Sequence, residues 1–82
     1  MAYMDIEIRL FHGLNKYLPP GEGNYSRQLK VPSGASVEEV LADLGLPKDV
    51  AMIHLVGGRT VSGRYILQPG DVLSAMLPAG GG

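Results

Sequence analysis

Hydrophobic and polar residues alternate strictly over Met4–Leu10, with the apolar residues at the four even-numbered positions. A period of two is typical of a strand that buries one face. Tyr25–Val31 alternates again, but Arg27 interrupts its apolar side. Between them, the apolar residues of Phe11–Leu18 are expected to close one end of the core as an irregular turn. We therefore predict an N-terminal hairpin whose second strand lies at a sheet edge.

The period changes to that of a helix after Ser36. Ser36 and Glu39 have the spacing of a capping box, in which each side chain hydrogen-bonds the backbone N–H of the other residue. The apolar positions that follow at helical spacing are Val37, Val40, Leu41 and Leu44. Gly45 is expected to adopt a left-handed C-terminal cap, with Leu46 making the hydrophobic contact of a Schellman motif. We predict one short helix packed on a sheet.

The second half of the chain contains two further apolar runs. Val50–Val56 is predicted as a strand, with Gly57-Gly58 as a tight turn and Arg59–Val61 as a short return strand. Ser62–Gln68 is expected to form a turn with buried side chains. Val72–Leu77 is predicted as the last strand, which Pro78 ends because proline cannot donate a ladder hydrogen bond.

These elements predict an α+β fold, with one main helix covering a mixed sheet of four to five strands. The apolar runs near Val50 and Val72 are expected in the middle of the sheet, shielded on both sides. We divide the chain into a domain over residues 1–77 and a flexible glycine tail over residues 78–82. Terminal glycines cannot pack a core and have high conformational entropy. A frayed end or an expression remnant would have the same composition.

Charge and composition exclude several functions. The chain has 82 residues with a formal net charge of -1, from 7 basic and 8 acidic residues. This balance disfavours nucleic-acid binding and electrostatic attachment to membranes. The absence of cysteine excludes disulfides and thiolate metal sites. The N-terminus has no signal-peptide pattern and no apolar run reaches membrane-spanning length, so cytoplasmic location is expected.

Isolated polar residues give little indication of catalysis. His12 and His54 have no carboxylate or cysteine at ligand spacing, so structural or surface roles are expected and no metal site is predicted. Ser36 is better explained as a helix cap than as a nucleophile. Gly57-Gly58 lacks a following Lys-Ser/Thr pair and is better explained as a turn than as a phosphate loop.

The order of these segments resembles a known family. The segments that carry the resemblance are Ile6–Phe11, Ala35–Leu41, Gly57–Val61, Leu67–Val72 and Pro78–Gly82. Together they resemble the ubiquitin-like β-grasp sulfur carriers of the MoaD/ThiS group, which includes the small subunit of molybdopterin synthase and the thiamine-pathway carrier. The resemblance covers nearly the whole chain, and the glycines after the Leu-x-x-Gly-Asp segment are its most specific part.

The resemblance implies a carrier that is not itself an enzyme. An E1-like adenylating enzyme would use ATP and Mg²⁺ to activate the carboxylate of Gly82, and a thiocarboxylate would then form. Its sulfur would pass to the large subunit of molybdopterin synthase, or to another acceptor enzyme, in molybdopterin or tungsten cofactor synthesis. Gly80 and Gly81 would let the tail enter a narrow channel because they lack a Cβ. This chain would bind no cofactor of its own.

Contacts with the partner enzymes are expected next to the tail. The apolar candidates are Met76, Leu77 and Pro78, and the polar candidates are Arg59 and Arg64. Three other functions remain open: a thiamine-type sulfur carrier, a ubiquitin-like modifier of lysines, and a non-covalent binding module that uses the sheet surface. Deletion of Gly81-Gly82 would separate the last from the others.

Overall fold

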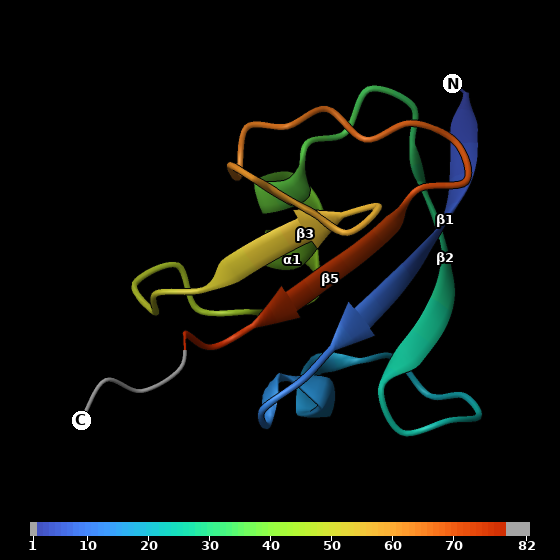
Figure 1. Cartoon of the computed structure of the whole chain (residues 1–82). Helices are drawn as coiled ribbons and strands as arrows, with labels where there is room; N and C mark the ends of the chain where they lie inside the picture. Colours follow the sequence, from blue (N-terminus) through green and yellow to red (C-terminus); the bar gives the residue numbers. More distant parts are fainter. Residues whose placement is uncertain (1, 79–82) are drawn as a thin grey trace.

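A mixed sheet of five strands forms the frame of the molecule, in the order β2-β1-β5-β3-β4 (Figure 1). The computed structural model describes residues 2–78. Its elements in chain order are β1 (Tyr3–Leu10), the 3-10 helix η1 (Leu14–Tyr17), β2 (Ser26–Pro32), α1 (Val37–Asp43), β3 (Ile53–Val56), β4 (Arg59–Val61) and β5 (Val72–Met76). The α+β prediction, with one main helix and up to five strands, is confirmed.

The N-terminal hairpin forms as expected, and its second strand is an edge strand. β1 pairs antiparallel with β2, and Met4, Ile6, Ile8 and Leu10 are all buried. η1 follows β1 and buries Leu14 against the same core. The alternation of apolar residues therefore predicts which face of β1 packs inward.

Both ends of α1 are built from the predicted capping residues. Glu39 N–H donates to Ser36 Oγ over 3.3 Å, and Ser36 N–H donates to Glu39 Oε1 over 3.2 Å. Gly45 has a φ of 93°, the left-handed conformation that glycine adopts without strain. Gly45 N–H donates to Ala42 O and Leu46 N–H donates to Leu41 O, the two bonds of a Schellman motif. The helix thus ends where the chain turns toward β3.

The last strand lies in the centre of the sheet. β5 runs parallel to β1, from the pair Glu7–Val72 to the pair Leu10–Ala75. On its other side β5 pairs antiparallel with β3, where Ile53 faces Met76. The first and last strands of the domain are therefore neighbours. The core lies between the sheet and α1, and its fully buried side chains include Ile6, Ile8, Leu10, Val37, Leu67 and Leu73.

Two sequence-based expectations are wrong and a third holds only in part. The apolar runs are not shielded on both sides, because α1 covers one face of the sheet and the opposite face is open; Ile53 and Leu55 are only half-buried. β3 starts at Ile53, and Val50 lies before the strand with 39% of its surface exposed. Within Ser62–Gln68, Leu67 is buried but Ile66 is 48% exposed.

None of the helices in the described range is long and apolar enough to cross a membrane.

Candidate functional site

The chain leaves the sheet at the end of β5, and we call this place the exit. Phe11 N–H donates to Ala75 O over 3.1 Å, which holds β1 against the last residues of β5. Ile53 of β3 pairs with Met76 from the other side. Leu77 packs against the core and Pro78 is exposed. The position at which the chain departs is therefore determined by a strand held from both sides.

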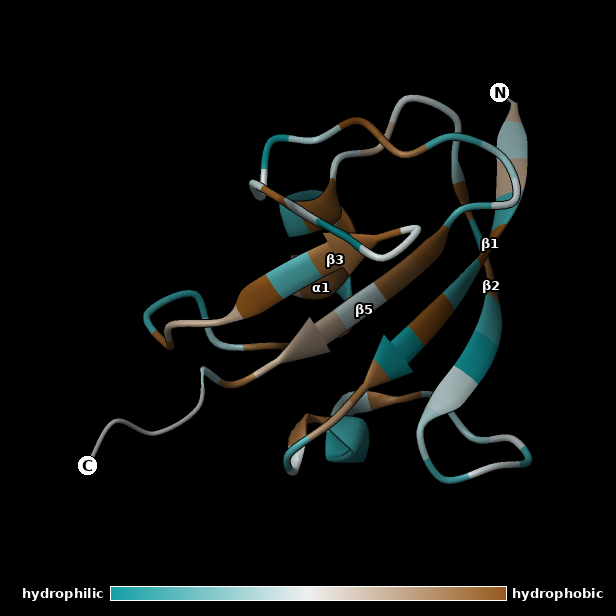
Figure 2. Ribbon diagram, viewed as in Figure 1, coloured by the Kyte–Doolittle hydropathy of each residue, from teal (hydrophilic) through white to brown (hydrophobic). Residues whose placement is uncertain are grey.

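Half-buried apolar side chains follow β3 and β5 on the open face of the sheet, and two of them, Ile53 and Met76, lie at the exit. Because Leu73 and Ala75 are buried toward α1, the alternating residues Val72, Ser74 and Met76 lie on the opposite face. The register places Ile53 and Leu55 of β3 on this face as well. Figure 2 shows hydrophobic positions along β3 and β5. We call Ile53, Leu55, Val72 and Met76 the apolar half of the open face.

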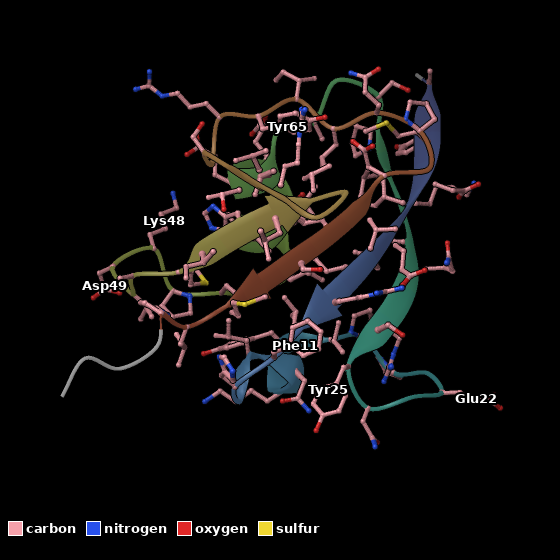
Figure 3. The ribbon with its side chains drawn as sticks, viewed as in Figure 1. Phe11, Glu22, Tyr25, Lys48, Asp49 and Tyr65 are labelled. Atoms are coloured by element: carbon pink, nitrogen blue, oxygen red, sulfur yellow. The ribbon has the colours of Figure 1, made fainter. Side chains whose placement is uncertain are left out.

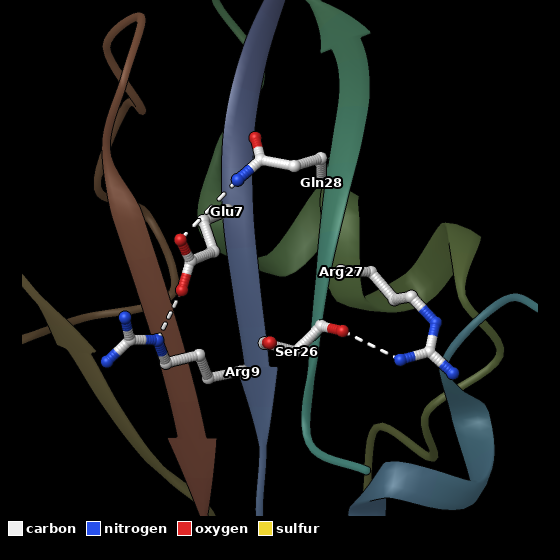
Figure 4. A network of polar contacts seen from close by, with 5 residues as sticks. All are labelled: Glu7, Arg9, Ser26, Arg27 and Gln28. Atoms are coloured by element: carbon white, nitrogen blue, oxygen red, sulfur yellow. Dashed lines mark hydrogen bonds and ion pairs between the residues drawn. The ribbon is translucent and has the colours of Figure 1, made fainter. Parts of the chain in front are cut away.

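The other half of the same face is polar. Arg9 forms an ion pair with Glu7, and Gln28 Nε2 donates to Glu7 Oε1 over 3.4 Å (Figure 4). Lys30 Nζ donates to Asp5 Oδ1 over 3.1 Å, and both side chains are largely exposed. These exposed pairs contribute little stability. Their effect is to divide the open face into an apolar part beside the exit and a polar part over β1 and β2.

An aromatic pair lies at the exit end of the molecule. The rings of Phe11 and Tyr25 stack with their centroids 5.6 Å apart and an angle of 25° between their planes (Figure 3). Leu10 N–H donates to Tyr25 O over 2.8 Å, so the hairpin register brings the two rings together. Tyr25 is 50% exposed. The sequence pattern does not predict this pair, because the two rings meet only through the register of the hairpin.

The structure does not bring Arg59 or Arg64 to the exit. Arg59 is exposed and faces Val56 in the β3–β4 hairpin, and Val56 faces Leu73 near the start of β5. Arg64 lies in the turn after β4, where its N–H donates to Ser62 Oγ over 3.2 Å. Met76, Leu77 and Pro78 do lie together. That the two arginines bind a partner stays a prediction, and they would do so away from the exit.

A groove of about 510 Å³ separates α1 from β3 on the covered side of the sheet. Glu38, Lys48, Val50, Met52 and His54 contribute to its lining. Burial lowers the pKa of His54 below the usual value, and the nearby Glu38 carboxylate partly offsets this effect. His54 therefore favours its neutral form.

Metal ligands do not gather in the part of the chain that the structure describes: no group of three His, Asp or Glu side chains is placed to hold an ion there. His12 is exposed on a left-handed backbone with φ of 56°. The tail residues Gly80, Gly81 and Gly82 lie outside the described residues. The exit is thus the last described point before the predicted site of activation.

Comparisons with known proteins agree with this architecture. The model of the Mut7-C ubiquitin family matches residues 3–78. No curated protein matches the chain. The solution structure of the Haloferax volcanii HVO 2177 protein is similar, with a TM-score of 0.75 and 26% identity, covering 98% of this chain and 88% of that one.

Two further solved structures share the fold. Small archaeal modifier protein 1 of H. volcanii aligns with a TM-score of 0.70 and 20% identity, over 93% of this chain and 99% of that chain. A ubiquitin from Caldiarchaeum subterraneum aligns with a TM-score of 0.57 and 21% identity, over 99% of this chain and 100% of that chain. The fold is therefore a ubiquitin-like β-grasp, and the resemblance to MoaD/ThiS-like proteins is confirmed at the level of this ubiquitin-like group.

Proposed function

The chain belongs to the Mut7-C ubiquitin family, and on that premise we propose that it serves partner enzymes as a ubiquitin-like co-substrate, activated at the main-chain carboxylate of Gly82. The observation that carries this proposal is the exit. A central strand delivers the chain to the surface at Met76, beside the apolar half of the open face. A partner that binds this surface would lie next to the place where the chain leaves the sheet, at Met76.

The proposed reaction begins with adenylation by an E1-like enzyme. A carboxylate oxygen of Gly82 attacks the α-phosphorus of ATP, the new O–P bond forms, and pyrophosphate leaves. The partner supplies Mg²⁺ and the groups that stabilise the developing charge. This step converts a poor electrophile into an acyl-adenylate with AMP as its leaving group.

Two alternative reactions could follow adenylation. A sulfur nucleophile can attack the acyl carbon and release AMP, which yields a thiocarboxylate for sulfur donation in molybdopterin or tungsten cofactor synthesis. Alternatively, the acyl group passes to a lysine amine and forms an isopeptide bond. The sulfur route is supported by the resemblance to MoaD/ThiS carriers. The modifier route is supported by the shared fold with a protein described as a small archaeal modifier.

Binding of a partner to the apolar residues beside the exit would offset the free-energy cost of ordering the tail. Fixing the backbone of one residue costs about 1–2 kcal/mol. Three glycines add no side-chain contacts, so the binding energy must come from the folded domain. Ile53, Met76 and Leu77 are apolar, half-buried and adjacent to the exit, which makes them the candidates for this contact.

ATP–pyrophosphate exchange with the cognate adenylating enzyme tests activation. We expect exchange with the full chain and none after deletion of Gly81-Gly82, with the deleted protein still folded. Exchange that persists after the deletion would overturn activation at Gly82 and favour another mode of action.

Charge substitution on the open face tests the docking surface. We expect Met76→Lys to raise the KM for adenylation about tenfold, because it places an ammonium in a desolvated apolar contact. Gln28→Lys is the matched control, since it introduces the same side chain into the polar half of the same face. Equal KM values for both variants would exclude the apolar half as the docking surface.

Intact-mass analysis separates the two second steps. With an active partner and a sulfur source, the carrier route predicts replacement of one terminal oxygen by sulfur. The modifier route predicts peptides of other proteins in which a lysine amine is linked to Gly82; after trypsin the remnant is residues 65–82, because Arg64 is the last basic residue of the sequence. Activation without the sulfur exchange would exclude the carrier route and leave the modifier route.

A further inference from the structure

The groove between α1 and β3 has an apolar middle. Leu41 and Leu46 line it with buried side chains, and Met52 lines it with a half-buried one. Val50, which is exposed, adds a further apolar side chain. The volume of about 510 Å³ lies within the range of about 300–1,000 Å³ that is typical of ligand sites. The groove therefore has room for several apolar groups of a ligand.

One end of the groove is acidic. Glu38 lies in the first turn of α1, where its N–H donates to Gly63 O over 2.9 Å, and both residues line the groove. Among residues 2–78, the Glu38 carboxylate accepts no hydrogen bond and forms no ion pair. Glu39 adds a second carboxylate, which the capping box holds at Ser36. A cationic group of a ligand is therefore favoured at this end.

The other end of the groove is basic. Lys48 lines the groove beyond the C-terminal end of α1, in the loop that leads to β3 (Figure 3). Its side chain is exposed, and in the described part of the chain it forms no ion pair, although Asp49 follows it in the sequence. The groove thus runs from a carboxylate at Glu38 to an ammonium at Lys48, with apolar side chains between them.

The backbone of β3 has no unpaired edge beside the groove. β3 lies between β5 and β4 in the sheet, so both of its edges are hydrogen-bonded. An extended peptide in the groove would gain no ladder hydrogen bonds, whereas a helix pairs its own N–H and C=O groups. A segment that lies along the groove is therefore expected to be helical, with an apolar stripe toward Leu41 and Met52.

A second copy of the chain has no suitable helix among its described residues. α1 is the one α-helix of residues 2–78, and its apolar residues Val37, Val40 and Leu41 are buried in its own core. The 3-10 helix η1 has only four residues. The helix that fits the groove is therefore expected from a different protein.

We propose that the groove between α1 and β3 binds a short amphipathic helix of a partner protein. The apolar stripe of that helix packs on Leu41, Leu46 and Met52. A lysine or arginine at one end of the stripe faces Glu38, and an aspartate or glutamate at the other end faces Lys48. These charges lie at the rim of the contact, so they determine the direction of the helix and the choice of partner more than the affinity.

The proposed binding is separate from activation at the tail. His54 lines the groove, whereas Ile53 and Leu55 lie on the open face of the sheet. A helix in the groove and a partner on the apolar half of the open face would contact opposite faces of β3. A second protein could therefore hold the chain while its exit stays accessible to an activating enzyme.

The test uses the full chain, labelled with ¹⁵N and with ¹³C in its methyl groups, and a blocked alanine-based peptide of about 18 residues, which is long enough to be helical in water. Three leucines at positions i, i+3 and i+7 form its stripe, with an arginine one turn before them and a glutamate one turn after them. We expect saturable shifts of the amide signals of Glu38 and His54 and of the methyl signals of Leu46 and Met52.

A peptide of the same composition, with its leucines spread around the helix, is the control. It should bind about tenfold more weakly, because it cannot present one apolar face to the groove. Equal binding of the two peptides would overturn the proposal.

Charge reversal at each end of the groove tests the two charged contacts. Glu38→Lys and Lys48→Glu should each weaken binding of the peptide about fivefold, because an attraction becomes a repulsion. The variant with both changes should bind within about twofold of the unaltered chain, because the peptide can then lie in the opposite direction. Asp43→Lys is the matched control on α1, since Asp43 does not line this groove, and it should leave binding unchanged. Weak binding by the double variant, or an equal loss in Asp43→Lys, would contradict the charged contacts.

The location of the shifts and the effect of the tail complete the test. Shifts confined to Ile53, Leu55 and Met76 would assign the peptide to the open face, and the absence of saturable shifts would remove the groove as a site for a helix. Deletion of Gly81-Gly82 should leave the affinity for the peptide unchanged, so failure of activation at the tail and failure of the groove are separate results. Loss of binding in the deleted chain would also overturn the proposal.

Discussion

Ile8 has no solvent-exposed surface, and it joins two strands of the core through its pairing with Leu73. We expect Ile8→Ala to lower the free energy of unfolding by about 2–5 kcal/mol, because it removes buried methyl groups and leaves a cavity. Urea denaturation measures this loss. Tyr3→Ala is the matched control on the exposed face of the same strand, and an equal loss there would contradict the account.

His54 is a residue whose charge state is expected to depend on folding. Its pKa is lowered by burial, so in the pH range between that pKa and the unfolded value the unfolded chain binds more protons. Stability is therefore expected to fall as pH decreases from about 6.5 and to level off below the folded-state pKa. His54→Gln should flatten this part of the profile of unfolding free energy against pH. If the slope is unchanged in the variant, the pH dependence of the unfolding free energy comes from other titratable groups.

Local sequence patterns predict which residues are buried, but they do not predict which distant residues come into contact. The apolar residues of β1 are buried as their alternation indicates. The stacking of Phe11 on Tyr25 follows from the register of the hairpin, which a long connection between the strands does not reveal. The placement of Arg59 away from the exit likewise depends on how β3 pairs with β5.

At the scale of elements, the capping box of α1 is the best test of local sequence signals. Ser36 is buried and its Oγ accepts from Glu39 N–H. We expect Ser36→Ala to lower the free energy of unfolding by about 1 kcal/mol. Ser33→Ala, at an exposed position before the helix, is the control and should have a smaller effect. Thermal melts of both variants measure the difference, and equal melting temperatures would argue against the cap.

The bounds of an element were predicted closely where capping or turn residues mark its ends. Where such residues are absent, the predicted bounds were wrong. The helix has a cap at each end, and the turn at Gly57-Gly58 has the positive φ values of a tight hairpin turn. The run from Val50 has no such signal at its start. Apolar residues alone do not distinguish a strand from a segment that lines a groove, and Val50 and Met52 line one.

At the scale of the whole molecule, the folded domain is expected to be independent of the tail. The described core includes Leu77 as its last packed residue. A chain that ends at Pro78 should therefore unfold with a free energy within about 0.5 kcal/mol of the full chain, as for a surface change. Chemical denaturation of both chains measures this. A clearly larger loss would show that loss of activation in tail deletions reflects instability.

The sequence predicted the α+β class and one covered face of the sheet, but not the open face. Whether a second layer covers a sheet depends on how many helices the chain contains, and a single short helix covers one side only. Val72 and Ile53 are apolar on a face that no described element covers. The division of this face into apolar and polar halves appears only once the strand order is known.

The parallel pairing of β1 with β5 has a mechanical consequence. When the start of β1 and the segment after β5 are pulled in opposite directions, the force runs along both strands. The ladder from Glu7–Val72 to Leu10–Ala75 is then loaded in shear, so its hydrogen bonds resist together and do not open one by one. A machine that unfolds the protein by pulling on its exit segment would meet this resistance first.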